Sequence, residues 1–171
     1  MIVIACNTAT AAAINVLRNE HPDIPFVGLE PALKPAAISS KTGKIGVLAT
    51  AGTFSGAHYL GTKARYAQNV EVISALADEF VELVERGEIS GTHAEEVVKS
   101  VISPLLEKGC DRIVLGCTHF PHLKQLISSA AGEGVEIIDS TSAVAKRVRE
   151  ILHEKDIFNP SLETASEHIF I

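Results

Sequence analysis

The run Lys44-Ile45-Gly46-Val47-Leu48-Ala49 decides the fold. It is apolar almost throughout instead of alternating, which is typical of a strand covered on both faces. Similar runs recur at Ile2–Ala5, Phe26–Leu29, Val70–Ser74, Arg112–Leu115 and Val135–Ile138. Longer helical patterns separate them, at Thr10–Asn19, Glu79–Arg86, His93–Glu107, His122–Ala130 and Ala143–Leu152. This regular alternation predicts right-handed parallel crossovers and a three-layer α/β fold.

The chain is predicted to form two lobes. Lys41-Thr42-Gly43-Lys44 is polar and contains glycine, so we expect the chain to cross between lobes there. Residues 1–41 and 133–171 would form a first lobe, and residues 42–132 a second. The chain opens directly on a strand of the buried type, and its last residues, His168–Ile171, again have a strand pattern. A sheet that begins and ends so abruptly predicts a first lobe without all of its strands.

Composition excludes several classes of function. The 171 residues carry a net charge of −6, which disfavours a broad phosphate-binding surface and hence nucleic-acid binding. No apolar run reaches the roughly 20 residues needed to span a bilayer, and the first residues lack the features of a signal peptide. We therefore expect a cytoplasmic protein. Three cysteines without a secretion signal make a disulfide framework improbable, and no side-chain cluster has the spacing of metal ligands.

Two cysteines occupy matching places. Cys6 follows the strand Ile2–Ala5, and Cys117 follows the strand Arg112–Leu115 and Gly116. Each is followed by polar residues and a predicted helix. Both thiols therefore belong at the carboxyl edge of a parallel sheet, where ligands bind in such folds. A lone cysteine is commonly a small buried hydrophobe, but two such loops favour catalysis over packing.

The helix amino ends predict the chemistry of these loops. Their free N–H groups and partial positive charge are expected to lower the pKa of a thiol. Asn7, Thr8 and Thr118 are candidates to hold a substrate carboxylate beside those N–H groups. His119, two positions after Cys117, is either a polar residue at a helix start or a group that tunes the protonation of the thiol.

Cys110 serves as a comparison because it precedes its strand and so lies at the opposite sheet edge. Seven residues at roughly 3.3 Å each place it about 20 Å from Cys117. The two cannot share a metal or a disulfide, and we interpret Cys110 as a packing residue.

Two opposed thiols suit the inversion of a carbon that carries a weakly acidic proton. One group removes the proton from one face, and the other returns a proton to the opposite face. A carbanion-like transition state then needs preorganised donors, which the helix amino ends and their Asn and Thr side chains can supply.

The residues also resemble a known family, the cofactor-independent glutamate racemases. Ala5-Cys6-Asn7-Thr8-Ala9 and Gly116-Cys117-Thr118-His119-Phe120-Pro121 are similar to its paired signatures, and Gly46–Thr53 is similar to the segment that opens its second lobe. The resemblance implies the two-lobed racemase fold, interconversion of L- and D-glutamate, a role in peptidoglycan synthesis, and no metal or organic cofactor. It implies these site residues: Cys6 and Cys117 as the acid/base pair, His119 assisting Cys117, and Asn7, Thr8, Thr50, Thr53 and Thr118 binding substrate.

The sequence departs from the family pattern before Cys6. Family members there carry an Asp-Ser-Gly loop and a Pro-Tyr-Gly loop, and neither exists in this chain. Three readings stay open: a working glutamate racemase, a catalytically silent fragment, and a related aspartate or hydantoin racemase, against which His119 argues through the resemblance. Unpaired strand edges in the first lobe predict a homodimer or other self-association.

Overall fold

The computed structural model describes residues 1–159, which contain two separate parallel sheets. The strand predicted at His168–Ile171 lies outside these residues. The strands are β1 (Ile2–Ile4), β2 (Phe26–Gly28), β3 (Lys44–Ala49), β4 (Glu71–Leu76), β5 (Arg112–Leu115) and β6 (Glu136–Ile138). All six lie within one residue or two of the predicted runs, so the α/β prediction with parallel strands is confirmed.

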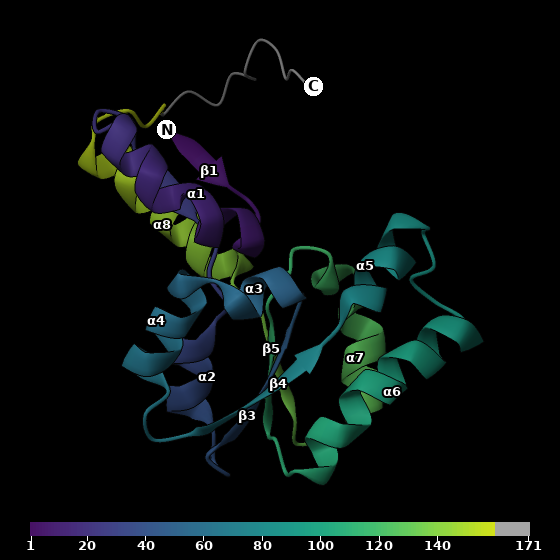
Figure 1. Cartoon of the computed structure of the whole chain (residues 1–171). Coiled ribbons are helices and arrows are strands. Elements are labelled where there is room, and N and C mark those ends of the chain that lie inside the picture. The colour runs from purple at the N-terminus through teal and green to yellow at the C-terminus, as the bar shows by residue number, and fades with distance from the viewer. Residues whose placement is uncertain (160–171) are drawn as a thin grey trace.

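The larger sheet has the order β4-β3-β5-β6 and forms the middle of a three-layer lobe. Helices α5 (Asp78–Glu85), α6 (Thr92–Glu107) and α7 (Lys124–Ala131) cover one face, and α2 (Leu33–Ser39) and α4 (Ala57–Tyr66) cover the other (Figure 1). A hydrophobic cluster fills each interface. Phe80 and Phe120 meet edge to face in the first cluster, and Leu33 and Tyr59 are buried in the second.

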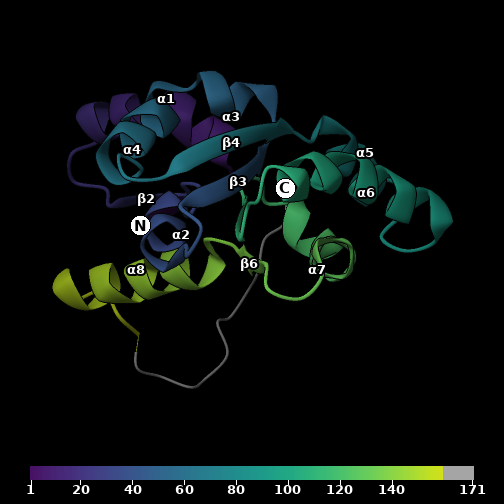
Figure 2. The same cartoon turned by 90° about the horizontal axis from the view of Figure 1, so that it is seen from below.

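The smaller sheet pairs β1 with β2 and lies between two helices. Helix α1 (Asn7–Glu20) and helix α8 (Thr141–Glu154) both contact β2, from opposite sides (Figure 2). Thr10 of α1 is fully buried and joins the strands, because its hydroxyl donates to the Ile4 carbonyl at 3.3 Å and accepts from the Leu29 N–H at 3.1 Å. This bonding fixes α1, and with it the first cysteine loop, on the end of the small sheet.

Strand burial is less uniform than the sequence suggests. β3 and β5 are buried on both faces, as predicted. The same prediction is wrong for β1, where Ile2 is 46% exposed, and for β4, where Leu76 is 59% exposed. The physical reason is position: β4 is an edge strand of its sheet, and β1 pairs with β2 alone among the described residues.

The predicted helices are all present, and the described residues contain three more α-helices. They are α2, α3 (Ala51–Ser55) and α4, which together with β3 fill residues 33–66. Glycine lowers helix propensity, and Gly52, Gly56 and Gly61 punctuate this stretch. The structure gives two of these glycines a packing reason, described below.

Strand β6 belongs to the large sheet, although the sequence places its residues in the first lobe. Residues 133–171 were assigned to the first lobe, yet β6 hydrogen-bonds along β5 and so extends the sheet of the second. The following helix, α8, returns to contact β2. The division of the chain into lobes otherwise stays a prediction.

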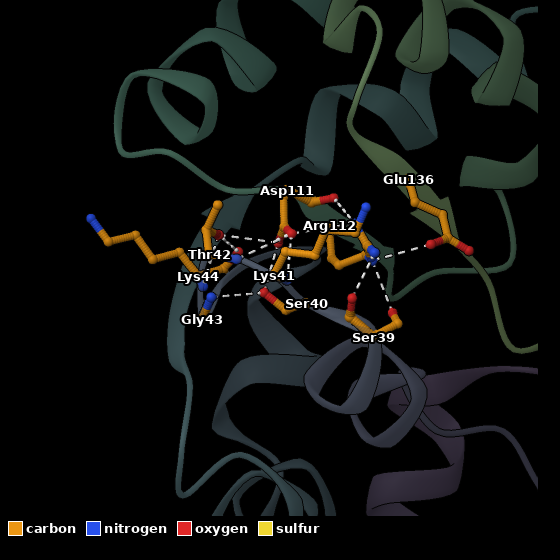
Figure 3. Close-up of polar contacts among 9 residues, drawn as sticks. All are labelled: Ser39, Ser40, Lys41, Thr42, Gly43, Lys44, Asp111, Arg112 and Glu136. Atoms are coloured by element: carbon orange, nitrogen blue, oxygen red, sulfur yellow. Dashed lines mark hydrogen bonds and ion pairs between the residues drawn. The ribbon is translucent and has the colours of Figure 1, made fainter.

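A polar cluster closes the amino ends of the large sheet (Figure 3). Asp111 accepts hydrogen bonds from the hydroxyls of Ser40 and Thr42 at 2.6 and 3.1 Å, and from the Lys41 N–H at 2.6 Å. Arg112, 7% exposed, donates to the hydroxyl and carbonyl of Ser39 and pairs with Glu136. The cluster thus fixes the 39–44 crossing to the start of β5.

Candidate active site

The first cysteine loop is built by the start of α1. Cys6 is the N-cap residue, with an extended backbone, and its sulfur accepts a hydrogen bond from the Ala9 N–H at 3.4 Å. A helix N-cap presents N–H groups that have no partner within the helix, so the thiol occupies the place where an oxygen acceptor usually sits. The side chain is half-buried.

The second loop begins where β5 ends. Gly116 is required there, because a Cβ at this position would lie 2.6 Å from the Leu48 carbonyl oxygen of the neighbouring strand β3. The chain then bends at Cys117 and enters the short 3-10 helix η1 (Phe120–Leu123). The N–H groups of Thr118 and His119 and the Thr118 hydroxyl lie near the Cys117 sulfur, where they favour its thiolate. The predicted helix start after Cys117 therefore exists, although its first turn is 3-10.

A buried hydrogen bond joins the two loops. The Asn7 side-chain amide donates from Nδ2 to the Gly116 carbonyl at 2.6 Å, across 109 positions of sequence. Asn7 is 5% exposed, and its Oδ1 has no hydrogen-bond partner among the described residues. The loops that carry Cys6 and Cys117 are thus neighbours, one from each sheet. The structure uses the Asn7 amide group to hold them together.

The electrostatics of Cys117 correct one expectation. We expected helix N–H groups to lower thiol pKa values, yet burial raises the pKa of Cys117 above its ordinary value. The N–H groups of Thr118 and His119 and the Thr118 hydroxyl act in the lowering direction but are outweighed. The negative charge of a Cys6 thiolate also acts to raise this pKa. Cys117 is therefore protonated at neutral pH unless a neighbouring base takes its proton.

His119 is the base beside Cys117, and Glu85, which the sequence did not single out, orients its ring. His119 Nδ1 lies 3.6 Å from the Cys117 sulfur, and His119 Nε2 lies 2.6 Å from Glu85 Oε1. Because a carboxylate only accepts, Nε2 carries a proton and Nδ1 of the neutral ring can accept one from the thiol. Glu85 ends α5, 34 positions away, and no local pattern marked it. Only the packing of α5 on η1 brings it here.

Three of the predicted threonines meet where the start of α1 lies against α3. The hydroxyl of Thr8 lies 3.1 Å from that of Thr53 and 3.3 Å from that of Thr50, and the latter two are 3.4 Å apart. Thr8 begins α1, whereas Thr50 and Thr53 belong to the start of α3. Hydroxyls can donate and accept in turn, so this triangle can reorganise around a polar ligand.

A comparison with known proteins places the chain in a family. Residues 1–148 match the family model described as Asp/Glu/hydantoin racemase. The chain belongs to this family. It is 43% identical over 166 residues to a glutamate racemase of Herpetosiphon aurantiacus, an alignment that covers 97% of this chain and 65% of the relative. The relative at 42% identity, from Ectopseudomonas mendocina, is also a glutamate racemase, of which 59% is covered.

Solved racemase structures share the fold. Glutamate racemase RacE1 of Bacillus anthracis superposes with a TM-score of 0.81 at 34% identity, covering 94% of this chain and 60% of that one. The Escherichia coli enzyme, solved with L-glutamate and the activator UDP-MurNAc-Ala, superposes with a TM-score of 0.79 at 36% identity, covering 88% and 57%. The two-lobed racemase fold is thereby confirmed. The chain spans roughly three fifths of the length of the relatives it matches, 65% and 59% for the two named by sequence.

Within the racemase fold, a small cavity marks the junction beside Cys117. It measures about 60 Å³ and is lined by Asn7, Cys117, Thr118, Asp139 and Ser140 among others. Larger hollows of about 500 and 640 Å³ lie beside β2 and between α6 and α7, and neither is lined by a cysteine. Convergence of reactive groups identifies a site better than volume does, so we place the candidate site where the two cysteine loops meet. The small cavity marks only the Cys117 side of it, because Cys6, Thr8, Thr50 and Thr53 are not among its lining residues.

The third cysteine behaves as predicted. Cys110 is 4% exposed and packs in the hydrophobic cluster on one face of the large sheet, before β5 begins. Burial and the nearby carboxylates of Glu71 and Asp111 raise its pKa to about 11. Among residues 1–159, no group of three His, Cys, Asp or Glu side chains is placed to hold a metal ion. No helix in that part of the chain is long and apolar enough to cross a membrane.

Proposed function

We propose that this chain carries the two-thiol site of a glutamate racemase, with Cys6 and Cys117 as the acid/base pair. The observation that supports this most is the Asn7 to Gly116 hydrogen bond, which holds the two thiol-bearing loops against one another from separate sheets. The glutamate racemases at 43 and 42% identity support glutamate as the substrate. Because the chain spans only part of those relatives, the activity of the whole protein is included in the proposal.

In this mechanism one sulfur, as a thiolate, removes the α-proton of glutamate, and the opposite thiol returns a proton to the other face of the carbon. The roles exchange with the direction of reaction. Since burial raises the pKa of Cys117, this residue begins as the acid in the resting site. When Cys117 must act as the base, His119 accepts its proton through Nδ1, and Glu85 stabilises the resulting imidazolium.

The remaining polar groups bind and orient the substrate. Thr8, Thr50 and Thr53 offer hydroxyls on one side of the junction, and Thr118 offers one beside Cys117. Asn7 contributes chiefly through the loop contact, because its amide N–H already has a partner. The chemistry uses the substrate and these side chains alone, with no cofactor. The D-glutamate formed would supply peptidoglycan synthesis in the cytoplasm.

Two other functions compete with this one. The family description also includes aspartate and hydantoin racemases, but the two relatives at 43 and 42% identity are glutamate racemases. A catalytically silent chain, which binds a partner or associates with itself through the exposed strand β1, is the rival from another class. Sedimentation across a concentration series tests self-association, and turnover tests activity.

The decisive experiment replaces each thiol. The variants are made in the protein expressed from the longest reading frame that contains this sequence. Cys6→Ser and Cys117→Ser should each lower its rate of racemisation by about 10²- to 10⁴-fold, because each removes one of two required proton carriers. Cys110→Ala is the matched control and should keep activity, since Cys110 lies in the core away from the site. The measurements are circular dichroism of D- and L-glutamate and α-proton exchange in heavy water.

Single-thiol variants should still exchange the α-proton of one enantiomer, because one base can remove and return a proton on the same face. Racemisation at the unmodified rate in either serine variant would refute the two-base scheme. Turnover of aspartate or a hydantoin in preference to glutamate would refute the substrate assignment and leave the site standing.

A further inference from the structure

Helix α1 contacts the second lobe at several points, and two of them fix the helix without using the Thr8 hydroxyl. The first is the amide of Asn7, at the start of the helix, bound to the Gly116 carbonyl at 2.6 Å. The Gly116 carbonyl also fixes the orientation of that amide, since only the NH₂ side can donate to it. Oδ1 is left buried and without a partner among the described residues, which costs about 1–3 kcal/mol.

The second point is a close contact between small residues. A Cβ on Gly56 would lie 2.7 Å from the Cβ of Ala11, one turn along α1 from Asn7. Gly56 has φ −70° and ψ 130°, which any residue adopts, so its backbone conformation does not require glycine. The absence of a side chain is what lets the two helical segments approach.

A neighbouring pair repeats the pattern. A Cβ on Gly52 would lie 2.8 Å from Cγ2 of Thr8. Gly52 lies in α3, and Gly56, four positions on, is the extended residue between α3 and α4. Thr8 and Ala11 are three positions apart on α1 and so share a face of that helix. We name the four residues Thr8, Ala11, Gly52 and Gly56 the α1–α3 seam.

The seam connects directly to both thiols. On one side, α1 carries Cys6 as its N-cap, and Ala11 lies five residues on, about 7.5 Å along the helix axis. On the other side, α3 follows β3 after one residue, and β3 is hydrogen-bonded to β5, which leads into Cys117. A helix is stiff, so a shift at Ala11 moves Cys6 relative to Cys117.

We propose that Gly56 and Ala11 are positioning residues, and that their close contact sets the gap between the thiols of Cys6 and Cys117. This rests on the proposed two-thiol function. Two carbon atoms in ordinary contact are about 3.5–4.0 Å apart, so a methyl group on Gly56 pushes α1 outward by about 1 Å. The Asn7 bond acts as the pivot, and the contact at Ala11 sets the tilt of the helix.

The chain offers a matched set of variants. Gly56→Ala inserts the methyl group, Ala11→Gly removes the methyl group it meets, and the double variant exchanges the two. Gly61→Ala is the control, because Gly61 lies inside α4 and a Cβ there meets nothing within 4 Å. All four are made in a Cys110→Ala background so that Cys6 and Cys117 are the only thiols. Thermal unfolding of each variant establishes that it folds.

The first readout is the thiol separation, measured without reference to activity. Bis-methanethiosulfonate reagents of increasing spacer length are added to the 171-residue chain, and mass spectrometry identifies the shortest that bridges Cys6 to Cys117. We expect Gly56→Ala to need a longer spacer, and the double variant and Gly61→Ala to match the parent. An unchanged spacer in Gly56→Ala, or a double variant no closer to the parent than the single one, would overturn the proposal.

The second readout is racemisation by the longest reading frame. A misplacement of about 1 Å at a reacting centre costs about 10²-fold in rate, and we expect a loss of that order in kcat for Gly56→Ala. Activity should return in the double variant, and a purely structural role for Gly56 would not produce that return. If the parent bridges normally but never racemises glutamate, the proposed function fails while the seam stands. If the bridging length shifts and kcat does not, the seam has no positioning role.

Discussion

The polar clusters at the two ends of strand β5 differ in how many hydrogen-bond partners their groups have. At the amino end, Asp111 and Arg112 are surrounded by partners: the carboxylate accepts four hydrogen bonds from residues 40–42, and the guanidinium contacts Ser39, Asp111 and Glu136. At the carboxyl end, the Asn7 amide has one partner and an orphaned oxygen, and Cys117 has a raised pKa. The short strand β5 thus joins a cluster whose polar groups are hydrogen-bonded to one that keeps a buried oxygen without a partner among the described residues.

This difference separates stability from reactivity. A buried polar group with all its partners stabilises one arrangement of the chain, whereas one that lacks partners costs free energy until a ligand or proton arrives. The amino-end cluster holds the crossing between the lobes, and the carboxyl-end groups stay available for chemistry. Changes at the first end should therefore alter unfolding, and changes at the second should alter turnover.

The largest effect is expected on the free energy of unfolding, from a substitution of Arg112. Arg112→Met keeps the length of the buried stem but leaves the Ser39 carbonyl without its donor and Asp111 without its cation. We expect a loss of about 3 kcal/mol in the free energy of unfolding, because removing one partner leaves the other buried and unpaired. Urea denaturation measures it. Arg147→Met, at an exposed position on α8, is the control and should change little. A loss below that of the control would show that the network is not a source of stability.

A smaller effect is expected from the protonation of Asp111. Burial alone would raise its pKa, but the hydrogen bonds from Ser40, Lys41 and Thr42 outweigh it and lower the pKa to about 2. A carboxyl whose pKa is depressed by folding contributes stability above its unfolded pKa of about 3.9, and loses it as pH falls toward about 2. The contribution is about 2.6 kcal/mol, at 1.36 kcal/mol per pKa unit.

The test compares Asp111→Asn with the parent at pH 6 and pH 2.5. The parent should lose its advantage over the variant across that window. An advantage that is constant with pH would mean that the Asp111 charge does not contribute through these hydrogen bonds.

The smallest of the three effects is expected at the carboxyl end, from Glu85. Glu85→Gln keeps a side-chain oxygen within reach of His119 Nε2 but removes the charge that stabilises the imidazolium. We expect about a tenfold loss of kcat/KM, equal to about 1.4 kcal/mol, in both directions alike because the two enantiomers have equal free energy. The melting temperature should not move, because Glu85 is exposed. Glu82→Gln, exposed on the same helix, is the control. Turnover in Glu85→Gln no lower than in the Glu82→Gln control would contradict the role assigned to His119.

The sequence by itself determined the strands, the sheet edge and the thiols. The apolar runs at Lys44–Ala49 and Arg112–Leu115 are buried on both faces as predicted, and a cysteine directly after a parallel strand lies at the carboxyl edge of the sheet. Paired motifs around Cys6 and Cys117 then led to the family that the comparison confirms. These inferences succeed because they depend on local period and on chain direction alone.

Only the tertiary structure decided which distant groups meet. Glu85 reaches His119 because α5 packs on η1, Asn7 meets the Gly116 carbonyl across 109 positions, and Gly56 matters because Ala11 lies 2.7 Å from where its Cβ would be. Burial likewise decided that the pKa of Cys117 rises, where the N–H groups alone predicted a fall. The physical reason is common to all four: contact, desolvation and close approach depend on residues brought together by packing, which no local pattern specifies.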